Sequence, residues 1–383
     1  MTIERLLDRR RPAITGLPAV SLFSGVGGLD LGVSRAGFDV RVAVEYDADS
    51  AASLRVNHFR GRPELVIERS ILEIATEEIL DRANLKVGEP ALVVGGPPCT
   101  PFSKSGYWLE YKRKGLDPNA SLLDEFVRVV REARPAAALL ENVHGLAYQN
   151  HNRGPFTRLL LGLAEAGYQT SWRVLNAADY GVPQLRKRLF VYAIRDGEPP
   201  DFPSTTHSGW SETRRRIDES LRPYVTSSQA IGDLEEQDAL REVEEEVGGR
   251  YGCLLPEIPP GDNYLFFTDH RGHPAPRFNW RSRYWTFLLK LDPDRPATTI
   301  QSQPGPYIGP FHWRNRRLRL PEIKRLQTFP DDYAIVGSRR SAQSQIGNAV
   351  PPQLAEIVAR PLAKIPVSHV ESGQLDLVAA GVA

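Results

Sequence analysis

Short apolar runs recur through the first 196 residues, separated by stretches with the mixed pattern of helices. The runs lie at 18–23, 40–45, 91–94, 136–140 and 189–194. Candidate helices stand between them, for example at 47–59 and 121–133. Strands of unbroken apolar character that alternate with helices are typical of a parallel sheet covered on both faces. We therefore expect an α/β domain over 18–196.

The pattern changes after residue 196, and the remainder divides into further parts. Over 197–325, prolines, aromatics and charges follow one another without strand and helix alternation, which indicates a second, smaller domain. At 326–366 a turn and an amphipathic helical pattern return, so this segment is expected to rejoin the first domain. Residues 1–17 are expected to be an N-terminal extension and 367–383 a weakly ordered tail.

Residues suited to chemistry follow several of the apolar runs directly. They are a glycine turn at 25–28, Glu45, a Pro-Pro-Cys turn at 97–99, and the pair Glu141 and Asn142. In open α/β sheets, ligands bind at the carboxyl ends of the strands. We therefore expect these groups to meet at one edge of the sheet and to form the functional site.

The glycine turn, SLFSGVGGLDLG, follows a strand and opens a helix. Its glycines allow a ligand to approach the backbone at the positive end of that helix. A dinucleotide fingerprint needs Gly-x-Gly-x-x-Gly, but Asp30 stands at the third position. Glu45 ends the next strand, where an acid accepts hydrogen bonds from ribose hydroxyls. A nucleoside without a pyrophosphate fits both facts, and S-adenosylmethionine is one. The alternative is a turn that binds no ligand.

The run GGPPCTPFS places Cys99 directly after a Gly-Gly-Pro-Pro turn. A structural cysteine packs as a small hydrophobe in a strand or helix, whereas this run holds a thiol in one orientation in a loop. The chain has two cysteines, which excludes a disulfide framework and a four-cysteine zinc site and favours a reducing compartment. Cys253, within YGCLL, is expected to be a core residue.

Charge is nearly balanced overall, at +1, but it is unevenly distributed. Positions 311–325 hold six basic residues and one acid, and 276–290 hold four basic residues, five aromatics and no acid. Such faces suit phosphate binding and base stacking, and the alternative is a solvated surface over core aromatics. The N-terminus lacks the apolar run of a signal peptide and no stretch is long enough to span a bilayer, so we expect a cytoplasmic protein.

Taken together, the motifs resemble in order and approximate spacing those of the C5-cytosine DNA methyltransferases. The motifs are SLFSGVGGLD, VEYD, GGPPCTPFS, ENV, QLRKR at 184–188 and QIGNAVPP. The resemblance covers 18–196 and 295–363. It implies the Rossmann-like mixed sheet of S-adenosylmethionine-dependent methyltransferases, with helices on both faces. It also implies a target-recognition domain at 197–325 and a C-terminal motif packed beside the first one.

The resemblance implies S-adenosylmethionine as cofactor, no metal, and a defined set of cofactor-binding residues. The set is Phe23, Ser24, Gly25, Gly27, Gly28, Leu29, Glu45, Tyr46, Ser70, Ile71, Gly96, Asn348 and Val350. The chain departs from the family at Ser70, where an aspartate usually precedes the isoleucine and contacts the adenine amino group. Serine accepts a hydrogen bond but carries no charge, which weakens the expected contact with adenine.

The catalytic residues that the resemblance implies match the chemistry of methylation at C5. A thiolate at Cys99 would add to C6 of cytosine, so that C5 can attack the methyl group. Glu141 would hydrogen-bond N3 and the exocyclic amine, which requires a pKa raised by burial. The family pattern favours Arg186 near the base, facing its O2 oxygen, with Arg188 as support. Asn142 is expected to hold the Pro-Cys loop.

The expected substrate is duplex DNA, from which the target cytosine must be flipped out of the stack within a specific short sequence. Residues 103–119, directly after Cys99, suit a lid that contacts phosphate. Candidate DNA contacts in the lid and in the recognition domain are Ser103, Lys104, Lys112, Arg113, Arg277, Trp280, Arg281, Arg283 and Tyr284.

Three functions are alternatives to that of a DNA methyltransferase. A transfer-RNA cytosine-5 methyltransferase would use the same scaffold and chemistry. A catalytically silent DNA-binding relative would be expected to lack Cys99, Glu141 or the glycine turn, and all three are present. A nicotinamide oxidoreductase is opposed by the missing third glycine. We expect a monomer without an obligate protein partner, whose functional counterpart is a restriction endonuclease.

Overall fold

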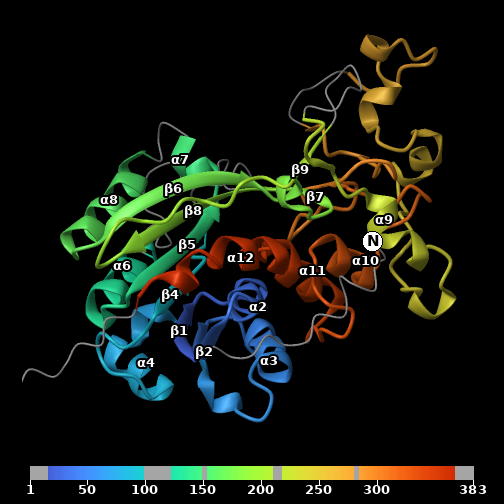
Figure 1. Cartoon of the computed structure of the whole chain (residues 1–383). Coiled ribbons are helices and arrows are strands. Elements are labelled where there is room, and N and C mark those ends of the chain that lie inside the picture. Colours follow the sequence, from blue (N-terminus) through green and yellow to red (C-terminus); the bar gives the residue numbers. More distant parts are fainter. Residues whose placement is uncertain (1–15, 99–121, 149–152, 210–217, 280–283, 367–383) are drawn as a thin grey trace, which may run out of the picture.

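A computed structural model of the chain describes residues 16–98, 122–148, 153–209, 218–279 and 284–366 (Figure 1). The strands of its main sheet are β1 Leu17–Leu22, β2 Phe38–Glu45, β3 Val66–Glu68, β4 Leu92–Gly95, β5 Ala137–Val143, β6 Gln169–Asn176 and β8 Lys187–Ile194. Their order in the sheet is β3-β2-β1-β4-β5-β8-β6. The first five pair in parallel, whereas β8 is antiparallel to both β5 and β6. The sheet is therefore mixed, as the family resemblance implied.

Helices cover both faces of this sheet (Figure 1). The α-helices are α2 Gly28–Arg35, α3 Ala48–Asn57, α4 Thr76–Ala83, α6 Leu122–Ala133, α7 Gly145–Tyr148, α8 Arg153–Glu165, α9 Ser227–Ile231, α10 Leu320–Leu326, α11 Arg339–Asn348 and α12 Pro352–Ala359. One face packs against α2, α3 and α12, and the other against α4, α6 and α8. Because successive side chains of a strand point to opposite faces, Ala19 of β1 joins the first core and Val20 the second.

The five apolar runs correspond to β1, β2, β4, β5 and β8, and the two expected helices to α3 and α6. The apolar pattern did not predict β6. This strand lies at the edge of the sheet, and Leu175 is the one buried residue along it. An edge strand that is largely accessible to solvent lacks the apolar run that marks a central strand.

The C-terminal segment returns to the first domain, and α12 lies beside α2 (Figure 1). A Cβ atom built on Gly32 would lie 2.3 Å from the Cβ of Ala355 and 2.6 Å from the backbone nitrogen of Glu356. The two helices therefore approach so closely that only glycine fits at position 32. This contact joins the start of the chain to its end.

The second domain projects away from the sheet and consists mainly of short 3₁₀ turns and loops (Figure 1). Its short strands are β9 His207–Ser208 and β10 Arg222–Pro223, while β11 Ala297–Thr298 pairs with β7 Gln184–Leu185 of the first domain. Its 3₁₀ helices include η8 Gly252–Glu257, η9 Tyr264–Phe267 and η10 Asp269–Arg271. They pack around a core of their own, which contains Leu255, Phe267 and Phe311.

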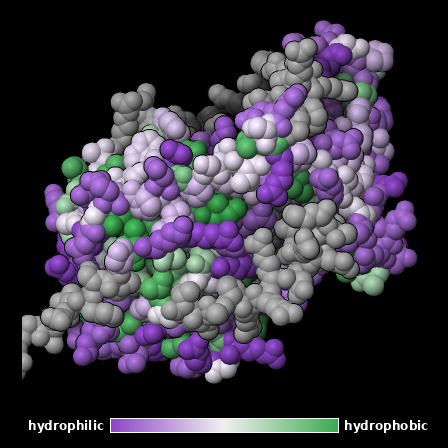
Figure 2. Space-filling model, in the orientation of Figure 1, coloured by the Kyte–Doolittle hydropathy of each residue, from purple (hydrophilic) through white to green (hydrophobic). Residues whose placement is uncertain are grey.

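The remaining 3₁₀ turns connect larger elements. They are η1 Pro63–Leu65, η2 Ile71–Glu73, η5 Ala177–Tyr180, η6 Gly232–Leu234, η7 Asp238–Leu240 and η12 Leu362–Lys364. Figure 2 shows one face of the molecule, on which hydrophilic residues predominate and hydrophobic ones occupy small separate areas. Within the described part of the chain, no helix combines the length and the apolar character needed to cross a bilayer.

Candidate active site

The glycine turn connects the end of β1 to the start of α2. Phe23, Gly25 and Gly27 have φ angles of 53°, 55° and 84°, in the left-handed region that favours glycine. The backbone N–H of Gly27 donates to Ser24 O at 2.9 Å and closes the turn. The Ser24 side chain is buried below it. A side chain at Gly25 or Gly27 would strain this conformation.

Glu45, at the carboxyl end of β2, lies against the same turn. Its Oε2 accepts a hydrogen bond from the N–H of Gly25 at 2.6 Å, and its Oε1 accepts one from the N–H of Asp47 at 2.8 Å. Burial raises the pKa of Glu45, while these backbone donors oppose the rise. The next residue, Tyr46, is 78% exposed. A carboxylate that contacts the turn is therefore followed directly by an accessible aromatic ring.

The other predicted cofactor residues near the turn have varied surroundings. Ser70 is half-buried, and its Oγ accepts a hydrogen bond from the N–H of Leu72 at 3.3 Å, which caps η2. Ile71 and Leu29 are buried in the two cores of the sheet. Phe23 is partly buried against the core that contains Ile71. Of this group, Ser70 keeps a polar atom at the edge of the site.

Asn142 joins β5 to the loop that leads to Cys99. Its Nδ2 donates to Pro97 O at 3.1 Å, and its Oδ1 accepts from the N–H of Val143 at 2.9 Å. Pro97 precedes Cys99 by two residues, and Cys99 itself lies outside the described residues. The hydrogen bond is the one that a residue holding the Pro-Cys loop would make.

Glu141 projects from β5 toward Arg188 of β8, the antiparallel neighbour of β5. Glu141 Oε1 lies 3.0 Å from Arg188 Nε, with the side chains 10% and 14% exposed. A Cβ atom built on Gly96 would lie 3.2 Å from the other oxygen, Oε2, so glycine keeps this oxygen accessible from the loop. Burial raises the pKa of Glu141, and the charges of Arg188 and Arg186 oppose the rise. The direction agrees with the raised pKa expected from the sequence.

Arg186 has a different environment from the one that we expected. It is fully buried, and its Nη2 donates to Gly347 O at 2.8 Å and to Ala349 O at 2.9 Å. The family pattern favoured Arg186 beside the base and Arg188 as support. The structure reverses these positions, because the guanidinium of Arg186 holds the C-terminal motif while that of Arg188 pairs with Glu141.

The C-terminal motif packs directly against the glycine turn. A Cβ atom on Gly28 would lie 2.3 Å from Val350 O, so Val350 approaches the first residue of α2 through its backbone. Asn348 is the last residue of α11 and is exposed. The first and last motifs of the chain thus meet at one place, as the resemblance implied.

Most of the predicted DNA contacts lie outside the described residues. These are Ser103, Lys104, Lys112, Arg113, Trp280, Arg281 and Arg283. Arg277 is 48% exposed, lies 3.7 Å from Glu257 through Nη2, and has its guanidinium 5.3 Å from the centre of the Phe267 ring. Tyr284 is 50% exposed. Arg277 and Tyr284 are therefore accessible on the second domain.

The basic segment 311–325 is largely neutralised by acids of the same chain. Arg319 Nε lies 2.8 Å from Glu245 Oε1, and Arg316 Nη2 lies 2.6 Å from Glu322 Oε1. Arg314 pairs with Glu235, and Arg325 pairs with Asp233 and Asp331. Four of its six basic residues are therefore paired with acids of the same chain, which leaves less of their charge available to phosphate. Its arginines hold the acidic stretch 235–246 against the segment that returns to the first domain.

Sequence reasoning also missed other residues near the site. Tyr333, within the motif LQTFPDDY, donates from its hydroxyl to Val26 O of the glycine turn at 2.7 Å. Asp30 was noted only as a missing glycine, yet it is fully buried behind the same turn. The motif LQTFPDDY was the feature of the sequence that could have marked Tyr333 as a site residue. Cys253, expected in the core, is exposed, because the turn that carries it directs it outward.

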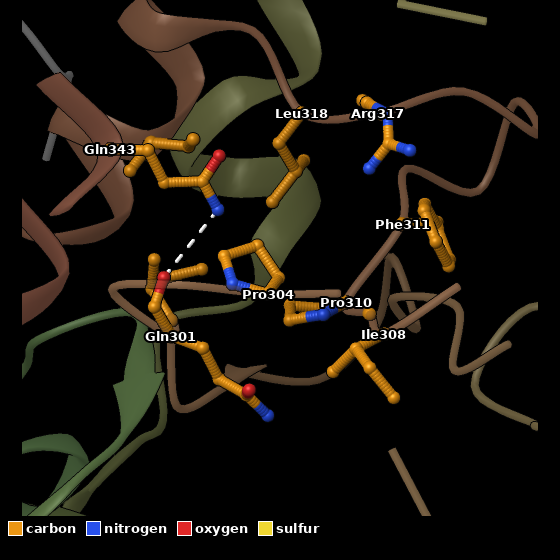
Figure 3. A pocket seen from close by; sticks show the side chains of 11 residues that line it. Gln301, Pro304, Ile308, Pro310, Phe311, Arg317, Leu318 and Gln343 are labelled. Carbon is orange, nitrogen blue, oxygen red and sulfur yellow. Dashed lines mark hydrogen bonds between the residues drawn. The ribbon is translucent and has the colours of Figure 1, made fainter. Parts of the chain in front are cut away.

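Two cavities differ in size and position from this site. The smaller, of about 30 Å³, lies between the loop 300–311 and α11, where Gln343 Nε2 donates to Gln301 O at 3.4 Å (Figure 3). This is the space of about one water molecule. The larger, of about 690 Å³, is lined by Phe38 and Val40 at the amino end of β2. Of the predicted site residues that the structure describes, none lines either cavity.

The arrangement suits a nucleoside at the glycine turn and a reactive group beside Glu141. The backbone of the turn is open to a close approach, and Glu45 can accept hydrogen bonds from a ribose. Among the described residues, no three metal-binding side chains gather in one place. The donor set therefore fits an adenosine-containing cofactor, and the Glu141 and Arg188 pair fits a ring that gains negative charge.

Comparisons with known proteins agree with this geometry. A family model for C-5 cytosine-specific DNA methylases matches residues 17–364. The Type II methyltransferase M.SacI of Streptomyces achromogenes is 50% identical over 90% of this chain and 92% of its own. The Type II methyltransferase M1.HphI of Haemophilus parahaemolyticus is 29% identical over 91% of this chain and 87% of its own.

Solved structures show the same fold. A putative DNA modification methyltransferase encoded within a prophage of E. coli superposes with a TM-score of 0.59 at 23% identity, over 91% of this chain and 99% of its own. The Dnmt2 methyltransferase of S. pombe superposes with a TM-score of 0.54 at 15% identity, over 90% of this chain and 96% of its own.

Proposed function

Because the chain belongs to the C-5 cytosine-specific DNA methylase family, we propose that it transfers a methyl group from S-adenosylmethionine to C5 of a cytosine flipped out of duplex DNA. The observation that carries the proposal is the pair Glu141 and Arg188, 3.0 Å apart at the loop that leads to Cys99. The products are 5-methylcytosine in DNA and S-adenosylhomocysteine.

Cys99 is the nucleophile of the proposed reaction. Its thiolate adds to C6 of the cytosine and the electron pair of the C5–C6 double bond becomes available at C5. After transfer, a base removes the C5 proton, the C6–sulfur bond breaks, and the thiolate returns. The hydrogen bond from Asn142 to Pro97 O keeps the approach to Cys99 in a fixed conformation.

Glu141 and Arg188 manage the charge that the addition creates. A protonated Glu141 donates through Oε2 to N3 of the ring, while Arg188 holds Oε1. Burial raises the pKa of Glu141, which favours the protonated form that this step needs. We assign the stabilisation of the O2 oxygen to Arg188 rather than Arg186, a choice that is supported by the contacts of Arg186 with the C-terminal backbone.

The cofactor site in this proposal is the glycine turn. S-adenosylmethionine carries the methyl group on a positively charged sulfonium sulfur. When the methyl group is transferred, this sulfur becomes a neutral thioether. The carboxylate of Glu45 accepts hydrogen bonds from the ribose hydroxyls, and the exposed ring of Tyr46 stacks on the adenine. Ser70 replaces the usual acid near the adenine amino group, which weakens that contact.

The biological role that we propose is protection of DNA in a restriction–modification pair, and its support is the similarity to relatives that are named Type II methyltransferases. The protein acts as a monomer, and the recognition domain selects the sequence. The RNA alternative and the silent alternative are not favoured by any observation made above.

The test is transfer of tritiated methyl from S-adenosylmethionine to duplex DNA and, separately, to bulk transfer RNA. We expect label in DNA, located by bisulfite sequencing at one cytosine of a short recurring sequence, and loss of the label in Cys99→Ser with cofactor binding retained. Label in RNA alone would favour the transfer-RNA enzyme. An absence of label in both, with cofactor bound, would favour a silent binder.

A further inference from the structure

Asp30 is a buried acid behind the glycine turn that the proposed mechanism does not use. It lies in the first turn of α2, has 0% exposure, and neither of its carboxyl oxygens meets a hydrogen-bond donor in good geometry among the described residues. Ser21 and Ser24 lie beside it and share a hydrogen bond of 2.7 Å between their hydroxyls. Asp30 is thus in contact with the end of β1 and with the turn itself.

The fold gains little from a carboxyl group at this position. Burial raises the pKa of Asp30 to about 6 and the nearby charge of Glu45 adds to the rise, while the hydroxyls of Ser21 and Ser24 and the backbone N–H of Asp30 oppose it only in part. Tyr333 does not compensate, because its hydroxyl donates to Val26 O. Burying a polar group without full hydrogen bonding costs free energy. A neutral side chain of the same shape would fill the space at a lower cost, so the charge itself requires an explanation.

The electrostatics of the turn supply one. The N-terminus of α2 begins at Gly28 and faces the turn, and the positive end of a helix dipole favours anions over cations. A methyl donor with a positive sulfur is disfavoured there unless negative charge lies close by. Glu45 supplies one carboxylate, whose oxygens bind the N–H groups of Gly25 and Asp47. Asp30, buried in the first turn of α2 beside Ser21 and Ser24, is a second carboxylate.

We propose that Asp30 is a specificity-determining residue whose carboxylate makes the glycine turn prefer the cationic methyl donor to its neutral product. This inference rests on the proposed function for the identity of the donor. Methyl transfer removes the positive charge from the sulfur, so S-adenosylhomocysteine loses the attraction that held S-adenosylmethionine. Because charges in a buried site are weakly screened, Asp30 acts without touching the ligand.

The test is calorimetric measurement of the dissociation constants of S-adenosylmethionine and S-adenosylhomocysteine at pH 7. Asp30→Asn keeps the shape and removes the charge, and we expect about tenfold weaker binding of S-adenosylmethionine with at most about twofold weaker binding of S-adenosylhomocysteine. Ser21→Ala removes a hydroxyl that lowers the pKa of Asp30, so it should weaken binding of S-adenosylmethionine in the same direction as Asp30→Asn but by a smaller factor. Equal losses for both ligands in Asp30→Asn would overturn the inference.

A second measurement needs no variant of Asp30 and decides the matter if Asp30→Asn does not fold. In the wild-type protein the preference for S-adenosylmethionine should fall as the pH is lowered from 7 to 5, because Asp30 becomes protonated near pH 6. The other groups facing Asp30 are Glu45 of β2 and Tyr333 after α10. Because the charge of Glu45 contributes to the raised pKa of Asp30, the fall should persist in Glu45→Gln but be displaced to lower pH. A preference independent of pH would overturn the inference. Failure of the wild type to bind either ligand would instead overturn the proposed function.

Discussion

Arg188 and Glu141 form an ion pair across neighbouring antiparallel strands, with Nε 3.0 Å from Oε1. Val143 is the residue opposite Arg188 in the ladder, so Glu141 lies two positions away on the same face of the sheet. The pair is fixed by the sheet rather than by a loop. It therefore holds one oxygen of Glu141 in place while leaving Oε2 toward Gly96.

The two arginines of the QLRKR run should separate activity from stability. We expect Arg188→Ala to lower kcat about a hundredfold, since it removes charge stabilisation at the reacting ring. It should destabilise the protein less than Arg186→Ala, because Glu141, whose pKa is already raised by burial, can take up a proton when its partner is removed. Arg186→Ala should destabilise the protein by about 3–5 kcal/mol, because buried carbonyls of Gly347 and Ala349 lose their donor. Urea unfolding and methyl transfer measure the two effects. If instead Arg186→Ala lost activity with normal stability and Arg188→Ala lost stability, Arg186 would be the arginine that contacts the base.

Asn142 should affect turnover without affecting cofactor binding. Asn142→Ala removes the hydrogen bond to Pro97 O, which should cost about 1 kcal/mol of stability and reduce kcat at least about tenfold through misplacement of the loop. Asn142→Asp has the same shape but cannot donate, so it should behave alike. An Asn142→Asp variant with normal turnover would show that this hydrogen bond is not needed.

Gly32 should be intolerant of any side chain. Gly32→Ala places a Cβ 2.3 Å from the Cβ of Ala355 and 2.6 Å from Pro352 O, so α12 must move away from α2. We expect a loss of about 2–4 kcal/mol by thermal or urea unfolding. Gly154→Ala in α8 is the matched control, since nothing lies within 4 Å of its Cβ. The control should be neutral or stabilising by less than about 1 kcal/mol.

Asp30 should make stability decrease as the pH rises. Its pKa in the folded protein is about 6 against the usual 3.8, so the folded state binds the proton more tightly than the unfolded state. Folding therefore loses up to about 3 kcal/mol between pH 4 and pH 7 from this group. Asp30→Asn should be more stable than wild type above pH 6, with the difference vanishing near pH 4. A destabilised variant at pH 7 would contradict the expected cost of this charge.

The arginines of 311–325 should matter for folding rather than for DNA affinity. Arg319→Gln leaves the partly buried Glu245 without its closest cation and should cost about 3 kcal/mol. The slope of DNA affinity against salt should not change, because Arg319 contacts no phosphate. The exposed Arg340 offers a control, as Arg340→Gln should leave stability unchanged. A reduced salt slope in Arg319→Gln would return this segment to the DNA interface.

The sheet was predictable because its central strands are buried on both faces and therefore appear as apolar runs. β6 was not predictable in this way, since an edge strand carries no such run. The glycine turn, Glu45 and Glu141 were predictable as site residues because each follows a run. The mixed character of the sheet came from the family resemblance, because an apolar run carries no sign of strand direction.

Arg186 and Arg188 could not be told apart from their sequence. They are identical residues two positions apart, and their roles depend on where 347–349 passes in the folded chain. The ion pairs of the basic segment 311–325 could not be predicted for a related reason. Its acidic partners, such as Glu245 and Asp233, lie some 80 residues earlier, and only the fold brings them together. Local composition does not reveal such distant pairing.

The contact between α2 and α12 determines when, during synthesis of the chain, the region around the glycine turn can finish folding. About 320 residues separate Gly28 from Pro352, which corresponds to roughly 15–65 seconds of translation at typical rates. Throughout that interval α2 lacks the helix that covers it, and the glycine turn lacks its contact with Val350. A chain truncated before α12 therefore lacks the contacts that Val350 and Ala355 make with α2, so that synthesis of α12, rather than completion of the sheet, is the step that completes the surroundings of the glycine turn.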